Sequence, residues 1–392
     1  MRWERDGWAR RWNAERLVAG VEEVLRSWPL DPARAAGELD RLLRAATPDA
    51  VAVLEGAYRG RRRTLAPVLG AGALTGDFGR SAEAVAALAT FDRSGYLREA
   101  GVRWLAGRAG PFALPYLLLR LNDPVDPVRR RAVAAVRARL TAGSATALVP
   151  LLPLVEGLGA RRRAGPVARA IGELLVAGDP AGRAALWTGA RGGDPAVAAA
   201  CLRLLATVEP AAAAEHAVRT GDPPLRLWAA AVATAPSLDP AARHHLLALL
   251  ESDTNPRIRW RVLRARARRP DGEPYLRRAL LDPDARVRYL ARAGLRALGH
   301  TGSADLYRRT LAGAGGTPAT TVGALAGLAD MGTREDAGRV VRFLEHPNAR
   351  VRGEAWRALA ALDPEAFAAR ADRLRADPSG KVRRLRPAGG PG

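Results

Sequence analysis

Cysteine and histidine, which build most metal sites and many catalytic sites, are scarce in this 392-residue sequence. Cys201 is the only cysteine, which excludes an internal disulfide and a metal site of several cysteines. Its alanine- and leucine-rich surroundings predict a small buried residue on a helix. The histidines include no pair spaced four residues apart, as a helical zinc motif requires. Phosphate-binding loops, nucleophile elbows and dinucleotide fingerprints are also missing. The sequence therefore favours a protein without enzymatic activity, cofactor or metal.

Long hydrophobic runs are missing as well. The N-terminus lacks the apolar stretch of a secretory signal. The most apolar segment, residues 148–158, contains two prolines and is too short to span a bilayer. We therefore expect a soluble cytoplasmic protein that does not insert into a membrane.

Acidic residues are too few to balance the basic ones. The chain has 62 lysines and arginines against 40 aspartates and glutamates, a formal net charge of +22, and Lys381 is the only lysine. GC-rich codon usage would explain arginine in place of lysine, but it does not explain the uncompensated excess. Such a charge favours an acidic protein or nucleic acid as partner. The alternative is a composition bias with no ligand.

A turn, an aliphatic residue, an arginine and an alanine-rich helix recur in this order along the chain. The aliphatic–arginine pairs are Leu97-Arg98, Val128-Arg129, Leu225-Arg226, Ile258-Arg259, Val287-Arg288, Val351-Arg352 and Val382-Arg383, and Val197-Ala198 fits the same frame without the arginine. The second members lie 28 to 33 residues apart, or 69 and 64 where a degenerate repeat intervenes. This spacing predicts a repeat of about 31 residues.

The residues around each turn predict two helices per repeat. A first helix precedes the turn, and a second helix follows it and carries the anchor arginine. Asp, Asn or Ser, good N-cap residues, stand four positions before nearly every anchor. The apolar residues of each second helix recur at the helical period, so neighbouring helices must stack to bury them. We therefore expect an all-α fold, a right-handed α-solenoid of stacked antiparallel helix pairs.

The segment Leu281-Asp282-Pro283-Asp284-Ala285-Arg286-Val287-Arg288 resembles a HEAT repeat of the short subtype, which is also seen in phycobilisome-lyase-like proteins. Residues 346–352 and 377–383 match the same pattern, and the resemblance covers roughly residues 81–386. It implies that the turn aspartates and the helix arginines pair between successive repeats as a ladder. By position, the ladder would contain Asp92, Arg98, Asp123, Arg129, Asp253, Arg259, Asp282, Arg288, Asp377 and Arg383. His346 and Ala198 interrupt it.

Three parts of the chain differ in their match to the repeat. Residues 1–80 have a helical pattern but fit the repeat poorly, so we interpret them as an N-terminal helical cap or subdomain. Residues 81–386 form the predicted solenoid. Residues 387–392 are rich in proline and glycine and predict a disordered tail.

Nine further arginines on the predicted second helices have no role in the ladder. We expect them to line a basic concave surface that binds an anionic partner: Arg130, Arg131, Arg137, Arg261, Arg264, Arg268, Arg292, Arg296 and Arg357. Trp104, Trp228, Trp260 and Trp356 lie on the same helices at different offsets from the anchor. Packing is the favoured role of these tryptophans, and exposed aromatic platforms are the alternative.

Two functions fit this pattern. The first is a non-enzymatic scaffold that binds an acidic protein or peptide. The second is a nucleic-acid-binding solenoid, in the manner of the HEAT-like alkylpurine DNA glycosylases, although no catalytic motif of that family matches residue by residue. The HEAT-repeat hydroxylases use His-Glu pairs, and this sequence contains none. The oligomeric state is left open.

Overall fold

The computed structural model describes residues 2–60, 78–161, 163–178, 180–313 and 316–385. Every regular element within these residues is a helix, which confirms the predicted all-α class. The predicted tail 387–392, and residues 61–77 of the predicted N-terminal subdomain, lie outside the described residues. Across the described ranges, no helix has the length and apolar character needed to cross a membrane. The chain divides into two compact units, Met1–Glu209 and Pro210–Gly392.

Unit 1 (Met1–Glu209) begins with three helices, α1 (Arg2–Ser27), α2 (Pro32–Ala45) and α3 (Pro48–Gly60). The helices that follow are α5 (Ala82–Ala89), α6 (Gly95–Ala106), α7 (Leu114–Arg120), α8 (Asp126–Arg137), α9 (Ala145–Leu148), α10 (Leu152–Gly159), α11 (Gly165–Glu173), α12 (Pro180–Ala190) and α13 (Pro195–Leu205). Short 3-10 and π segments join some of them. The helix α2 packs on α5, and α3 contacts α7 and α10. The helices α2 and α3 therefore pack on helices of the repeat array, and α1 packs on α2 and α3.

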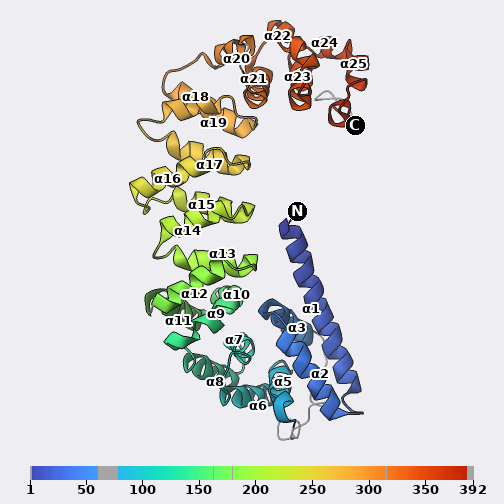
Figure 1. Ribbon diagram of the computed structural model, residues 1–392, viewed down its shortest axis with the longest axis vertical. Helices are drawn as coiled ribbons and strands as arrows, with labels where there is room; N and C mark the ends of the chain where they lie inside the picture. The colour runs from blue at the N-terminus through green and yellow to red at the C-terminus, as the bar shows by residue number, and fades with distance from the viewer. Residues whose placement is uncertain (1, 61–77, 162, 179, 314–315, 386–392) are drawn as a thin grey trace. The chain divides into compact units, whose positions relative to one another are not determined.

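Unit 2 (Pro210–Gly392) continues the repeat. Its helices are α14 (Pro210–Arg219), α15 (Pro223–Ala233), α16 (Pro240–Leu250), α17 (Pro256–Arg266), α18 (Glu273–Ala279), α19 (Ala285–Ala297), α20 (Ser303–Ala312), α21 (Pro318–Met331), α22 (Ala337–Val341), α23 (Ala349–Leu362), α24 (Pro364–Ala368), α25 (Ala371–Arg375) and α26 (Gly380–Arg383). In Figure 1 the second helices α15, α17 and α19 lie side by side, and the first helices α14, α16 and α18 lie beside them in another layer. This arrangement confirms the predicted α-solenoid of stacked helix pairs.

Local capping explains where the second helices begin. The side chains of Asp194, Asn255, Asp284 and Asn348 accept hydrogen bonds from backbone N–H groups in the first turn of the helix that follows them. These bonds satisfy donors that have no partner within the helix. The helix α8 differs, because it begins at Asp126 itself and Val125 takes the cap position. The cap residues therefore mark the turn in each repeat to within one residue.

The degenerate repeat of unit 2 has an unusually buried second helix. All residues from Thr321 to Leu328 in α21 are buried. Gly323 lies against the carbonyl oxygen of Leu281, and Gly327 lies against the ring of Tyr307, so a Cβ at either position would overlap its neighbour. Two glycines therefore permit the close packing of α21 against the preceding repeat, at Leu281, and against α20 of its own repeat, at Tyr307.

Candidate binding surface

The turns of five repeats are held by the same two hydrogen bonds. The first aspartate accepts from the backbone N–H two residues later, and the anchor arginine donates back to the carbonyl oxygen of that aspartate. The carboxylates are Asp92, Asp123, Asp253, Asp282 and Asp377, at 2.6 to 2.9 Å, and the corresponding donors are Arg98, Arg129, Arg259, Arg288 and Arg383, at 2.7 to 3.0 Å. These bonds tie the start of each second helix to its own turn.

Four anchor arginines also reach the turn aspartate of the next repeat. The pairs are Arg98–Asp123, Arg226–Asp253, Arg259–Asp282 and Arg352–Asp377, with shortest N···O distances of 2.9, 2.7, 2.7 and 2.8 Å. In Asp377 the hydrogen bond from Arg352 is the main cause that lowers the pKa of the carboxyl, with a smaller contribution from the Ser379 N–H. The carboxylate of Asp377 is therefore stabilised in its charged form.

The remaining ladder arginines have other partners, and for Arg129 and Arg288 the repeat that follows is degenerate and lacks a turn aspartate. Arg129 pairs with Asp126 of its own helix. Arg288 donates instead to Asp330, at the end of α21, at 2.9 Å. Arg383 lies in α26 and contacts the carbonyl oxygens of its own turn. The ladder therefore depends on which acceptor the neighbouring repeat supplies.

His346 occupies the turn position that aspartate has elsewhere. Its Nδ1 accepts from the Asn348 N–H at 3.1 Å, and Arg352 donates to its carbonyl oxygen at 2.9 Å. The imidazole nitrogen therefore makes the same contact as an aspartate oxygen. Its geometry is that of a turn residue.

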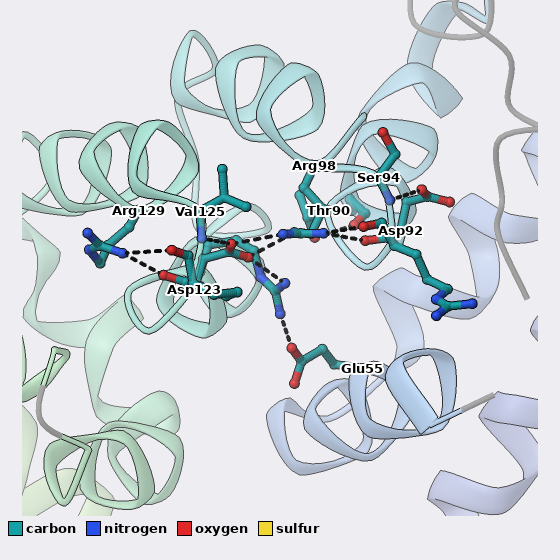
Figure 2. Close-up of polar contacts among 12 residues, drawn as sticks. Glu55, Thr90, Asp92, Ser94, Arg98, Asp123, Val125 and Arg129 are labelled. Carbon is teal, nitrogen blue, oxygen red and sulfur yellow. Dashed lines mark hydrogen bonds and ion pairs between the residues drawn. The ribbon is translucent and has the colours of Figure 1, made fainter. Parts of the chain in front are cut away.

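A buried ion-pair network joins the N-terminal helices of unit 1 to the first repeats. Figure 2 shows Arg98 directed at Asp123, with Glu55 nearby. Arg120, which is fully buried, pairs with Asp123 at 3.1 Å and with Glu55 of α3. Burial opposes ionisation of Asp123, but hydrogen bonds from Arg98 and the Val125 N–H, and the charge on Arg120, outweigh it and lower the pKa of the carboxyl. This network is inaccessible to a partner and stabilises the packing.

Four of the nine predicted binding arginines have acidic partners. The pairs are Arg130–Asp126 at 2.5 Å, Arg131–Glu99 at 2.8 Å, Arg292–Asp330 at 2.8 Å and Arg357–Glu354 at 2.7 Å. Arg292 is the least exposed of these, with 13% of its side chain accessible. Its charge is therefore compensated within the protein.

The other five are Arg137, Arg261, Arg264, Arg268 and Arg296. Within the residues that the structure describes, none of these five forms an ion pair. Arg137 ends α8 in unit 1, while the rest lie on or just after α17 and α19 in unit 2. Arg264 stacks over the ring of Trp260, with 5.4 Å between the guanidinium carbon and the ring centroid. The uncompensated charge among the predicted residues of unit 2 is thus concentrated on two neighbouring second helices.

A groove of about 890 Å³ crosses these helices. Leu227 of α15, Trp260 of α17 and Tyr289 of α19 give it an apolar lining, and Arg257, Arg261 and Arg286 surround them. Tyr289 is 69% exposed. No ion pair forms at these three arginines in the described part of the chain. The groove therefore combines aromatic surface with uncompensated positive charge.

The sequence does contain a signal for this groove. Leu227, Trp260 and Tyr289 each directly follow the anchor arginine of their repeat, and Arg257 and Arg286 each lie two residues before it. Equal offsets in successive stacked repeats place side chains in one row. The positions of the tryptophans alone do not reveal this row, because a leucine and a tyrosine stand at the positions equivalent to Trp260 in the neighbouring repeats. Leu227, Arg257, Arg286 and Tyr289 therefore line a groove that the sequence alone did not predict.

Comparison with known proteins assigns no family to this chain. No protein-family model and no curated protein matches the sequence. Among solved structures, a mutant form of Kap121p is 13% identical with a TM-score of 0.30, covering 92% of this chain and 46% of its own. The karyopherin Kap121p bound to the extreme C-terminus of the protein phosphatase Cdc14p is 12% identical with a TM-score of 0.27, covering 93% and 48%. Human deoxyhypusine hydroxylase is 19% identical with a TM-score of 0.22, covering 91% and 95%.

The chain spans about half the length of the karyopherin chains it matches. At these identities and TM-scores, the likeness carries no argument about what the chain does. The case for function therefore depends on the groove and its charges.

Proposed function

We propose that this protein is a non-enzymatic scaffold that binds an acidic protein partner through the second-helix layer of unit 2. The observation that carries the proposal is the groove across α15, α17 and α19, where Arg257, Arg261 and Arg286 form no ion pair within the described residues. An acidic partner would supply the missing carboxylates and gain charge-assisted hydrogen bonds. This layer is the one that we expected to line the concave side of the solenoid.

The chemistry of the groove favours a polypeptide as its ligand. Besides the arginines, the carboxylates of Asp284 and Asp330 face the groove. The two cap hydrogen bonds, from the backbone N–H groups of Arg286 and Val287, both go to Oδ1 of Asp284. A polypeptide backbone carries both donors and acceptors and can satisfy carboxylates and guanidinium groups together. A phosphodiester backbone carries only acceptors, so it cannot donate a hydrogen bond to the carboxylate of Asp284.

The test is a charge reversal on α17 and the residues directly after it. The variant Arg261→Glu, Arg264→Glu, Arg268→Glu leaves the buried face of Ile258 and Val262 unchanged. With a labelled polyglutamate peptide, we expect fluorescence anisotropy to show binding that falls with salt and weakens at least tenfold in the variant. Circular dichroism should show unchanged helix content.

A matched control reverses the same number of charges on the first-helix layer. Arg219, Arg277 and Arg278 lie on α14 and α18 with 72%, 52% and 76% of their side chains exposed. Changing all three to Glu should alter peptide affinity by less than the α17 variant does. Equal losses in the two variants would mean that only net charge matters and would refute a defined surface.

Nucleic-acid binding is the second candidate, because exposed Tyr289 and the stacked Trp260–Arg264 pair could also support bases. Duplex DNA in a filter-binding assay across a salt series separates the two. Affinity clearly tighter than the non-specific range of about 10⁻⁴ to 10⁻⁶ M, or release of an alkylated base, would favour a repair-protein role in the manner of the alkylpurine DNA glycosylases. Binding to polyglutamate without such affinity supports the scaffold.

Two finer assignments accompany this proposal. The repeats are HEAT repeats of the short, phycobilisome-lyase-like subtype, supported by the turn pattern at residues 281–288 and by the turn geometry around Asp282. We also propose that the protein acts in the cytoplasm, the compartment expected from its sequence.

A further inference from the structure

The apolar side chains that line the groove of unit 2 recur at a regular spacing. Leu227, Trp260 and Tyr289 follow the anchor arginines of three consecutive repeats, so they form one apolar row across α15, α17 and α19. The three helices contact one another in this order and lie side by side in Figure 1. Packed helices lie about 8–10 Å apart. The apolar side chains are therefore presented at regular intervals along the stack.

A polypeptide in the polyproline II conformation matches this interval at every third residue. Its backbone advances about 3.1 Å per residue with three residues per turn, so three residues span roughly one helix layer and return the side chain to the same face. A side chain at one position and another three residues later can then contact neighbouring members of the row. The arginines at the equivalent positions of α17 and α19, Arg257 and Arg286, lie beside the row and can bind carboxylates between those side chains.

We infer that the groove binds an acidic segment in the polyproline II conformation whose apolar side chains recur every three residues. This inference rests on the proposed scaffold function and specifies the partner of the same site. The segment lies along the helix stack and across the helix axes. Its apolar side chains contact Leu227, Trp260 and Tyr289. Its carboxylates pair with Arg257 and Arg286. The ligand is selected by the spacing of its apolar side chains as well as by its acidity.

Three labelled peptides of about ten residues and equal net charge test the inference on the full chain. The first carries two leucines three residues apart among glutamates, the second carries the same leucines side by side, and the third has serine in place of both. Burial of the leucines against the row should make the first bind roughly tenfold tighter than the third. The second should fall between them, because adjacent side chains of a polyproline II helix point about 120° apart and cannot both face the row.

Substitutions in the apolar row show which side chains cause the tighter binding of the first peptide. Tyr289→Ala removes an exposed ring without opening the core, and it should reduce the advantage of the first peptide to about threefold or less. Trp260→Ala should act in the same way and serves as a second measurement. Tyr96→Ala is the matched control, because Tyr96 is also exposed, at 88%, but lies in unit 1. It should leave the advantage unchanged.

The outcomes separate the inference from the function on which it rests. Salt-dependent binding of all three peptides with equal affinity would overturn the spacing rule and leave the acidic scaffold standing. An equal effect of Tyr96→Ala and Tyr289→Ala would also overturn the spacing rule. Absence of binding by every peptide at low salt would overturn both. Tighter binding of a single-stranded DNA of the same charge would assign the row to base stacking and overturn the peptide ligand.

Discussion

Asp282 offers the sharpest test of how the repeats are joined. Its carboxylate accepts from Arg259 Nε and Nη2, both at 2.7 Å, and from the Asp284 N–H at 2.8 Å. The change Asp282→Ala removes all three bonds. Arg259 keeps its bonds to the carbonyl oxygens of its own turn, at 2.8 and 3.2 Å. The loss therefore falls on the contact between one repeat and the next.

The size of the expected stability loss in Asp282→Ala follows from the burial and charge of the broken contact. Hydrogen bonds to charged groups contribute about 1.5–3 kcal/mol each, but Asp282 and Arg259 keep 10% and 15% of their side chains exposed. Water can therefore solvate part of the arginine that remains. We expect the free energy of unfolding to fall by about 3 kcal/mol. Since unit 2 falls in the size range where 1 kcal/mol shifts Tm by about 2–4 °C, the expected loss is roughly 6–12 °C.

The measurement is urea and thermal unfolding followed by circular dichroism. Asp282→Asn keeps an oxygen acceptor for the Asp284 N–H but removes the charge, so it should lose about half as much stability. Exposed Glu335→Ala is the control and should change stability by less than about 0.5 kcal/mol. A melting temperature for Asp282→Ala equal to that of the control would refute the role assigned to this contact.

Three further predictions concern packing, the N-terminal helices and pH. Gly323→Ala forces a Cβ into a neighbouring carbonyl oxygen and should destabilise unit 2 by about 3 kcal/mol, whereas Gly338→Ala, with open space around it, should be neutral or slightly stabilising in a denaturation series. Glu55→Ala leaves fully buried Arg120 without one of its carboxylates, so hydrogen exchange of α1–α3 should accelerate, and unchanged exchange would contradict the anchoring role. The lowered pKa of Asp377 contributes stability that is present above the unfolded-state value of about 3.9 and disappears as pH falls through the folded-state value. Urea unfolding at a series of acidic pH values should therefore show wild type losing stability below about pH 4, and Asp377→Asn, which lacks this carboxylate, should lose less over the same interval.

The repeat and its turns could be predicted from the sequence because their causes are local. A cap such as Asp284 bonds N–H groups two and three residues away, and the anchor Arg288 reaches a carbonyl six residues back. Contacts this short recur in every copy of the motif, so they leave a pattern in the sequence. Stacking then follows, because no helix pair can bury its apolar face alone.

Tertiary structure decided the contacts whose partners lie far apart in the chain. Nothing in the sequence near Arg288 indicates that Asp330 replaces the missing turn aspartate, or that Arg120 meets Glu55 of α3. Which arginines keep an uncompensated charge was also decided by the fold. The sequence predicted nine binding arginines, and only the folded chain separates Arg292, which pairs with Asp330, from those without an acidic partner among the described residues. Helix periodicity fixes which residues share a face of one helix, whereas the choice of neighbour across the stack depends on how the whole repeat packs.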